Sequence, residues 1–128
     1  MKNNVARFFL EEIGEWTEQI EKIQEEVSGI EKTLESIVRQ NTITGIAAAT
    51  EAHQNLLDKQ IDVLGELQDE FNKQEMLLNP DGKSVKNGSL TTLLRNRQHL
   101  LRKKMKKAGK EYIDIKYSCH EFVSNMLK

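Results

Sequence analysis

The sequence predicts an all-α fold, an antiparallel up-down-up bundle of three long helices with left-handed coiled-coil packing. Composition is the first indication, because the 128 residues include seven glycines, one proline and only 5% aromatic residues, as is typical of helical chains. The second indication is that apolar side chains recur at every third or fourth position in three separate segments. The length fits one domain covering residues 1–128.

The first helix is expected over about residues 4–40. Its apolar residues follow steps of four and three without interruption: Phe9, Ile13, Trp16, Ile20, Ile23, Val27, Ile30, Leu34 and Ile37. This heptad repeat keeps one narrow face toward a partner helix. A rod of this length, about 55 Å at about 1.5 Å per residue, is not stable alone, so the rest of the chain must pack along it.

The second helix is expected over about residues 45–78 and the third over about 89–127. The second carries a rougher seam, formed by Ile46, His53, Leu57, Ile61, Leu64 and Phe71. The segment "NPDGKSVKNGS" predicts a loop at 79–88, after which Ser89 is expected to cap the third helix. The third seam comprises Leu90, Leu94, Arg97, Leu101, Met105, Ala108, Tyr112, Ile115, Cys119, Phe122 and Met126. Short connections between such rods make neighbouring helices antiparallel.

Charge is distributed unevenly along the chain. Residues 1–40 carry a net charge of −4, residues 41–85 carry −5 and residues 86–128 carry +8. The predicted basic surface consists of Arg95, Arg102, Lys103, Lys106, Lys107 and Lys110. These charges are either solvated faces that select how the helices pack or a surface for a partner. Nucleic acid is not expected as the partner because no aromatic residues interleave with the basic ones, whereas weak attraction to an anionic membrane is a secondary hypothesis.

The sequence does not indicate an enzyme, a cofactor or a metal site. A di-iron bundle requires Glu-x-x-His pairs, but Glu51 precedes His53 by two positions and Glu121 directly follows His120. We expect His53 to be partly buried and hydrogen-bonded on the seam, and Cys119 to act as a small apolar residue. No glycine-rich phosphate loop or nucleophile elbow is present in the sequence.

The sequence predicts a soluble chain in a reducing, cytosolic setting. A single cysteine cannot form an internal disulfide. No segment approaches the roughly 20 apolar residues that a membrane-spanning helix needs, and the first residues become acidic too early for a signal peptide.

Three segments resemble one known domain in the same order: "RFFLEEIGEWTEQIEKIQEEVSGIEK", "LLDKQIDVLGELQDEF" and "LLRNRQHLLRKKMKKAGKEYIDIKYSCHEF". Together they are similar to the three helices of the Habc domain of syntaxins, the Qa-type target-membrane SNAREs. The resemblance implies a regulatory protein-interaction domain in vesicle docking, membrane fusion and intracellular protein transport. The implied partners are the protein's own SNARE motif, other SNAREs and a Sec1/Munc18-type protein. The parent protein is then membrane-anchored, and this domain lies on the cytosolic face of the plasma membrane or an endomembrane.

Two features depart from the syntaxin pattern. A syntaxin continues after its third helix with a SNARE motif and an anchor, whereas the sequence stops at Lys128, so we expect a shortened chain or a stand-alone relative. The N-terminal peptide that many syntaxins use to bind Sec1/Munc18-type proteins is reduced to "MKNN", and binding through it is not expected.

In the closed state of several syntaxins, the SNARE motif lies as a fourth helix between the second and third helices. Apolar residues beside the seams would line such a groove, and they are Leu56, Val63, Leu100, Ile113 and Tyr117, with Leu93 also outside the seam. They serve either a fourth helix or a thicker three-helix core. The alternative function is a structural spacer or oligomerising bundle, such as a spectrin-like repeat or an adaptor.

Overall fold

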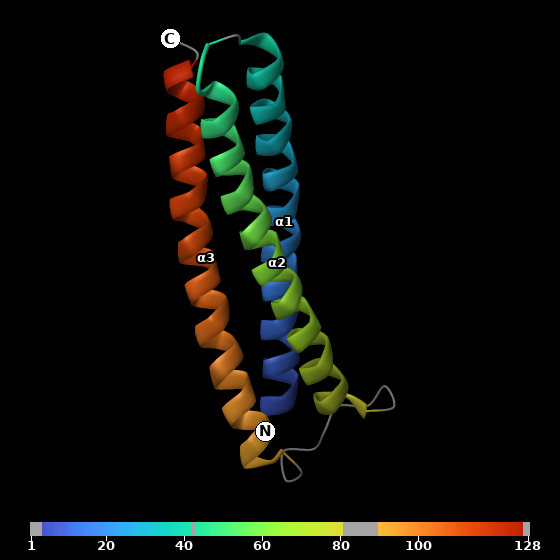
Figure 1. The fold of residues 1–128 in the computed structure, drawn as a ribbon. Coiled ribbons are helices and arrows are strands. Elements are labelled where there is room, and N and C mark those ends of the chain that lie inside the picture. The colour runs from blue at the N-terminus through green and yellow to red at the C-terminus, as the bar shows by residue number, and fades with distance from the viewer. Residues whose placement is uncertain (1–3, 42, 81–89, 127–128) are drawn as a thin grey trace.

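The computed structural model describes residues 4–41, 43–80 and 90–126, and these form an up-down-up bundle of three α-helices (Figure 1). The helices are α1 (Val5–Gln40), α2 (Ile46–Leu78) and α3 (Thr92–Met126). α2 runs antiparallel to both α1 and α3, and no strand occurs among the described residues. The predicted all-α fold class is confirmed.

The helix ends follow from local hydrogen bonds. The Asn4 side chain accepts a bond from the Arg7 backbone N–H at 2.9 Å and caps α1. Gly45 precedes α2 with a φ of 90°, in the left-handed region that glycine adopts without strain. The Thr91 hydroxyl accepts from the Leu94 N–H at 3.2 Å, so α3 begins at Thr92, later than predicted. The predicted cap Ser89 and loop positions 81–88 lie outside the described residues.

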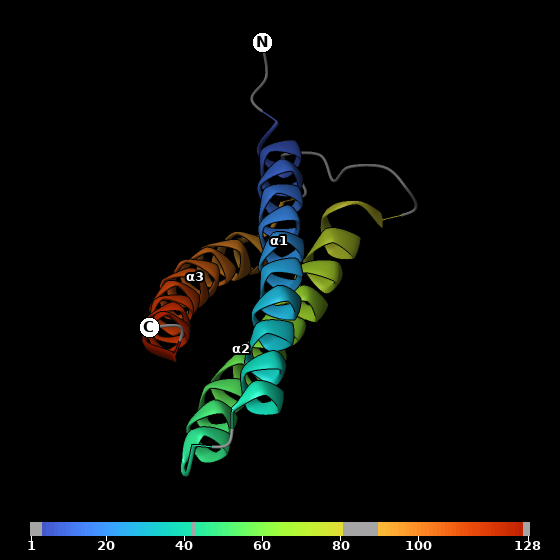
Figure 2. The same ribbon diagram turned by 90° about the horizontal axis from the view of Figure 1, so that it is seen from above.

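The seam of α1 matches the predicted heptad repeat. Eight of its nine predicted residues are buried, and Ile23 is half-buried. Ala6, fully buried, extends the repeat by one step toward the N-terminus. The regular stripe is therefore part of the core along the whole of α1. Figure 2 shows how the ribbons of α2 and α3 are arranged about this helix.

The seams of α2 and α3 contain polar residues that the apolar pattern did not identify. Gln60 is 3% exposed and Gln98 is fully buried, whereas the predicted seam residues Ile61 and Arg97 are only half-buried. Ile61 still packs against the core, as predicted, while beside Arg97 the adjacent Gln98 takes the buried position. The buried glutamines are accommodated because their amides bond across to a neighbouring helix. Thr50, Leu67, Gln74 and Leu78 complete the seam of α2.

The core consists of two clusters stacked along the rod. One contains Trp16 and Phe71, whose ring centroids are 5.2 Å apart, together with Leu101 and Met105. The other is built around Leu34, Leu57, Tyr112 and Cys119.

None of the three helices, within the described part of the chain, has the length and apolarity needed to cross a bilayer.

Candidate functional site

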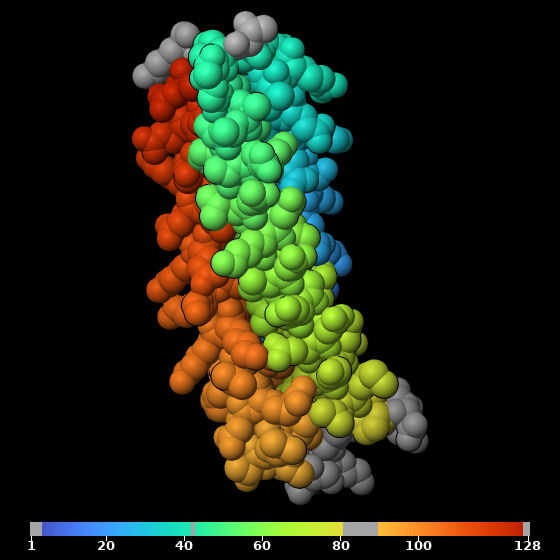
Figure 3. All heavy atoms as spheres, viewed as in Figure 1, coloured from blue at the N-terminus to red at the C-terminus, as the bar shows by residue number. Residues whose placement is uncertain are grey.

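A groove follows the outer side of the contact between α2 and α3, and we call it the α2–α3 groove (Figure 3). Its floor is apolar, because Val63 is half-buried and Leu67 and Ala108 are 4% and 2% exposed. Its rims carry charges of both signs: Glu66, Asp69, Glu70, Lys73, Lys104, Lys107 and Glu111. An apolar floor between charged rims is the arrangement that receives an amphipathic helix.

The heptad pattern of α3 determines which of its edges borders this groove. Arg97, Lys104 and Ser118 are separated by seven or fourteen residues and therefore share one edge. All three contact α2: the distances are 3.0 Å from Arg97 Nε to Gln74 Oε1, 3.0 Å from Lys104 Nζ to Glu70 Oε1, and 3.4 Å from Ser118 Oγ to His53 Nε2.

The opposite edge of α3 contacts α1. Lys116 Nζ lies 2.8 Å from Glu26 Oε1, and the Tyr112 hydroxyl donates to the same oxygen at 2.8 Å. The two hydrogen bonds hold the pKa of Glu26 below its usual value, that of Lys116 having the larger effect. α3 thus has one edge for each neighbour, and the face between these edges, opposite the core, is directed outward.

The structure divides the predicted groove residues between two surfaces. Val63 lines the α2–α3 groove. Leu56 is on the same edge of α2, seven residues before Val63, and is 43% exposed, while Leu100 on α3 is 52% exposed. Ile113 and Tyr117 are 63% and 73% exposed on the outer face of α3, toward the edge that contacts α1. These two are therefore reassigned from the groove to the outer face, because the edge of α3 toward α2 is formed by other residues.

The predicted basic surface also divides, here into paired and unpaired cations. Arg102 binds Glu12 with two hydrogen bonds, from Nε at 2.6 Å and from Nη2 at 2.8 Å. Lys107 lies 3.8 Å from Glu111. The side chains of the other four make no ion pair or hydrogen bond with a residue in the described ranges: Arg95, Lys103, Lys106 and Lys110.

A buried polar layer, which we call the glutamine layer, connects all three helices. Gln74 of α2 donates to Gln98 Oε1 of α3 at 3.2 Å, and Gln98 donates to Glu12 Oε1 of α1 at 2.8 Å. Burial raises the pKa of Glu12, but hydrogen bonds from Arg102 and Gln98 outweigh it, so the pKa is lower than usual. The feature of the sequence that could have indicated this layer is the presence of glutamines at seam positions. Because each member bonds to the next, the layer fixes the register of the helices.

A second groove lies between α1 and α2 and is acidic; we call it the acidic groove. Four carboxylates line it, Glu31 and Glu35 from α1 and Glu51 and Asp58 from α2, with Arg39 nearby. Burial, a hydrogen bond with Asp58 and repulsion from Asp58 and Glu35 raise the pKa of Glu31 to about 7. Sequence reasoning missed this site because its members come from two helices.

His53 is partly buried and hydrogen-bonded, and Cys119 is buried in the core, as predicted. The half-buried His53 has its Nδ1 2.8 Å from the Ala49 carbonyl oxygen and stacks on Phe122 with centroids 4.5 Å apart. Cys119 is fully buried, and this burial raises the pKa of its thiol.

Among the residues with described positions, no group of three His, Cys, Asp or Glu side chains could hold a metal ion. Three surfaces of the described bundle are candidates for a function: the α2–α3 groove, the acidic groove and the outer face of α3. No protein-family model, no curated protein and no solved structure matches this chain.

Proposed function

We propose that this chain is a protein-interaction module, the Habc-like regulatory domain of a syntaxin-type SNARE, and that it holds an amphipathic fourth helix in the α2–α3 groove. The single observation that carries the proposal is the apolar floor of Val63, Leu67 and Ala108 between charged rims. The resemblance of the three helical segments to syntaxin helices supports it. No catalytic activity and no cofactor are part of the proposal.

The charged rims give the groove a direction. Lys73 attracts acidic side chains and Glu66 and Asp69 attract basic ones, whereas Lys104 is paired with Glu70 across the groove and Lys107 with Glu111. A helix with an apolar stripe and charges on both sides is therefore favoured in one orientation and one register over others. The proposed ligands are the SNARE motif of the same protein, other SNAREs and a Sec1/Munc18-type protein, in vesicle docking and fusion on the cytosolic face of a membrane.

The mechanism that we propose is competition for the SNARE motif. A SNARE motif lying in the α2–α3 groove has its apolar stripe buried and is not free to assemble with other SNAREs. The glutamine layer suits this role because it holds α2 and α3 in a fixed register, so that the groove is formed before the ligand arrives. A preformed groove requires little ordering on binding.

The experiment is a calorimetric titration of the domain with a syntaxin SNARE-motif peptide. We expect Val63→Asp to weaken binding by at least tenfold, since it places a charge on the apolar floor. The matched control is Val38→Asp, which introduces the same charge on α1 in the acidic groove, away from the α2–α3 groove. Equal binding by the wild type and Val63→Asp, with both folded by circular dichroism, would contradict the proposal.

The second candidate is a structural spacer or oligomerising bundle, and exposed apolar side chains on α3 favour it. Leu93, Leu100, Ile113 and Tyr117 are each more than half exposed. Burial of these side chains between two copies would stabilise a dimer. Sedimentation equilibrium separates the candidates, because the spacer predicts self-association that Leu100→Ser abolishes and the interaction module predicts a monomer.

A further inference from the structure

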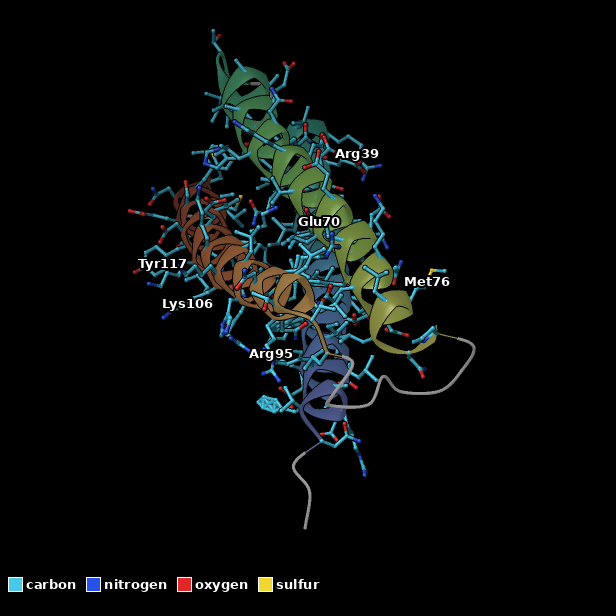
Figure 4. The ribbon with its side chains drawn as sticks, turned by 90° about the horizontal axis from the view of Figure 1, so that it is seen from below. Arg39, Glu70, Met76, Arg95, Lys106 and Tyr117 are labelled. Carbon is cyan, nitrogen blue, oxygen red and sulfur yellow. The ribbon has the colours of Figure 1, made fainter. Side chains whose placement is uncertain are left out.

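Five exposed residues form one continuous stripe along the outer face of α3. They follow one another by steps of three and four, which places them on one side of the helix: Lys103, Lys106, Lys110, Ile113 and Tyr117. Figure 4 shows Lys106 and Tyr117 projecting from α3 away from α1 and α2. We call these five residues the outer stripe.

The cations of the outer stripe have no role within the described bundle. Three basic residues on the edges of α3 form ion pairs, Arg102 with Glu12, Lys104 with Glu70 and Lys116 with Glu26. The three lysines of the outer stripe have no such partner among the described residues. Of the acidic residues of α3, Glu111 lies on the edge toward α2, whereas Asp114 and Glu121 border the stripe, four residues after Lys110 and Tyr117, and make no ion pair with a described residue.

The apolar residues of the stripe are also unused by the fold. Ile113 is 63% exposed and Tyr117 is 73% exposed, so neither contributes to the two core clusters. Leu100, which is 52% exposed, borders the stripe near Lys103. A helix face that combines free lysines with exposed aliphatic and aromatic residues is typical of peripheral membrane binding.

We propose that the outer stripe binds the surface of anionic phospholipid membranes. The lysines contact lipid phosphates and carboxylates, and Ile113 and Tyr117 enter the boundary between head groups and acyl chains. The stripe spans about 21 Å of α3, at about 1.5 Å per residue, and its five residues lie along one side of the helix. This inference goes beyond the proposed function and does not depend on it.

The charge distribution favours one orientation of the bundle on an anionic membrane. Residues 86–128 carry +8, whereas residues 1–40 and 41–85 carry −4 and −5. The acidic groove is lined by α1 and α2 alone. An anionic surface therefore attracts α3 and repels the opposite side of the bundle. Nucleic acid would use the lysines but leave the aliphatic side chains without a function, so we favour the lipid surface.

The experiment is flotation of the domain with phosphatidylcholine vesicles that contain or lack phosphatidylserine. We expect binding only with phosphatidylserine, and we expect K103Q/K106Q/K110Q to weaken it about a hundredfold, at about fivefold per lysine. The matched control, K22Q/K32Q/K59Q, removes three exposed lysines from α1 and α2 and should change binding by less than about threefold.

A second variant tests the apolar part of the stripe. I113S/Y117S should weaken vesicle binding about tenfold and make the remaining binding sensitive to salt, because only electrostatic attraction is left. No binding to phosphatidylserine vesicles, or equal losses in the two lysine variants, would overturn the proposal. Binding of an oligonucleotide in place of vesicles, unaffected by I113S/Y117S, would overturn it in favour of a polyanion surface. All three variants alter exposed side chains, and circular dichroism confirms that each is folded before the comparison.

Discussion

Replacing Glu31 with glutamine is expected to stabilise the bundle at neutral and alkaline pH. Glu31 lies half-buried in the acidic groove beside Glu35 and Asp58, where burial and these carboxylates raise its pKa to about 7. Above this pH, the folded protein must hold a carboxylate close to other carboxylates. Glutamine has nearly the same size and carries no charge, so it removes the repulsion without leaving a cavity.

The size of the effect follows from the pKa difference between the folded and unfolded chains. The pKa is about 7 in the fold and 4.5 in the unfolded chain, so the folded state binds more protons between these values. The free energy of unfolding therefore decreases as the pH rises from 4.5 to 7. The whole shift corresponds to roughly 3 kcal/mol, and because the groove is open to solvent we discount this to about 1 kcal/mol.

The assay is urea unfolding of the wild type and Glu31→Gln at two pH values. We expect the variant to be more stable by about 1 kcal/mol at an alkaline pH of about 8, and nearly equal to the wild type at an acidic pH of about 4. Glu18→Gln removes an exposed carboxylate from the same helix, is the matched control, and should show no such dependence. A stability difference that is the same at both pH values, or a less stable variant at the alkaline pH, would refute the reasoning.

Three further predictions concern the second core cluster. Leu57→Ala should lower the free energy of unfolding by about 2–5 kcal/mol in urea titrations, because Leu57 is fully buried; a loss below about 1 kcal/mol would show that the site is not packed. Tyr112→Phe removes the hydrogen bond to Glu26 and should lower the free energy of unfolding by about 1 kcal/mol. An unchanged midpoint of urea unfolding would contradict this bond. The buried Cys119 thiol, whose pKa is raised by burial, should react with a thiol reagent only when urea unfolds the chain, and rapid labelling of the native protein would disprove its burial.

The helices could be predicted from the sequence because the apolar period is long and regular. In α1, steps of four and three from Phe9 to Ile37 are compatible with little other than a helix with partners along its length. The bounds of α1 and α2 differ from the prediction by a single residue at their N-termini. α3 begins at Thr92, later than predicted, where the Thr91 hydroxyl accepts from the Leu94 N–H.

The glutamine layer could not be predicted from apolar periodicity. Gln74 and Gln98 occupy seam positions, but their polar side chains hide the repeat unless a partner across the bundle is known. The partner of Gln98 is Glu12, 86 residues away in the chain. Spacing within one helix does not determine which residues of another helix are opposite.

The candidate surfaces required the structure for a similar reason. The pattern identified Ile113 and Tyr117 as apolar residues outside the seam, but not the side of α3 on which they lie. The edges of α3 are identified by their contacts: Arg102 and Lys116 bond to α1, and Lys104 bonds to α2. With these contacts known, the two residues belong to the outer stripe and Val63 belongs to the α2–α3 groove.

The measurement that tests the proposed function most directly is a map of backbone amide shifts in the isotopically labelled domain, titrated with a syntaxin SNARE-motif peptide. We expect the shifts to concentrate at Val63, Leu67 and Ala108 on the floor of the groove, with none at Glu31 or Asp58 in the acidic groove. Saturation of the peptide without shifts on this floor, or shifts confined to other faces of the bundle, would contradict the proposal that the α2–α3 groove receives a fourth helix.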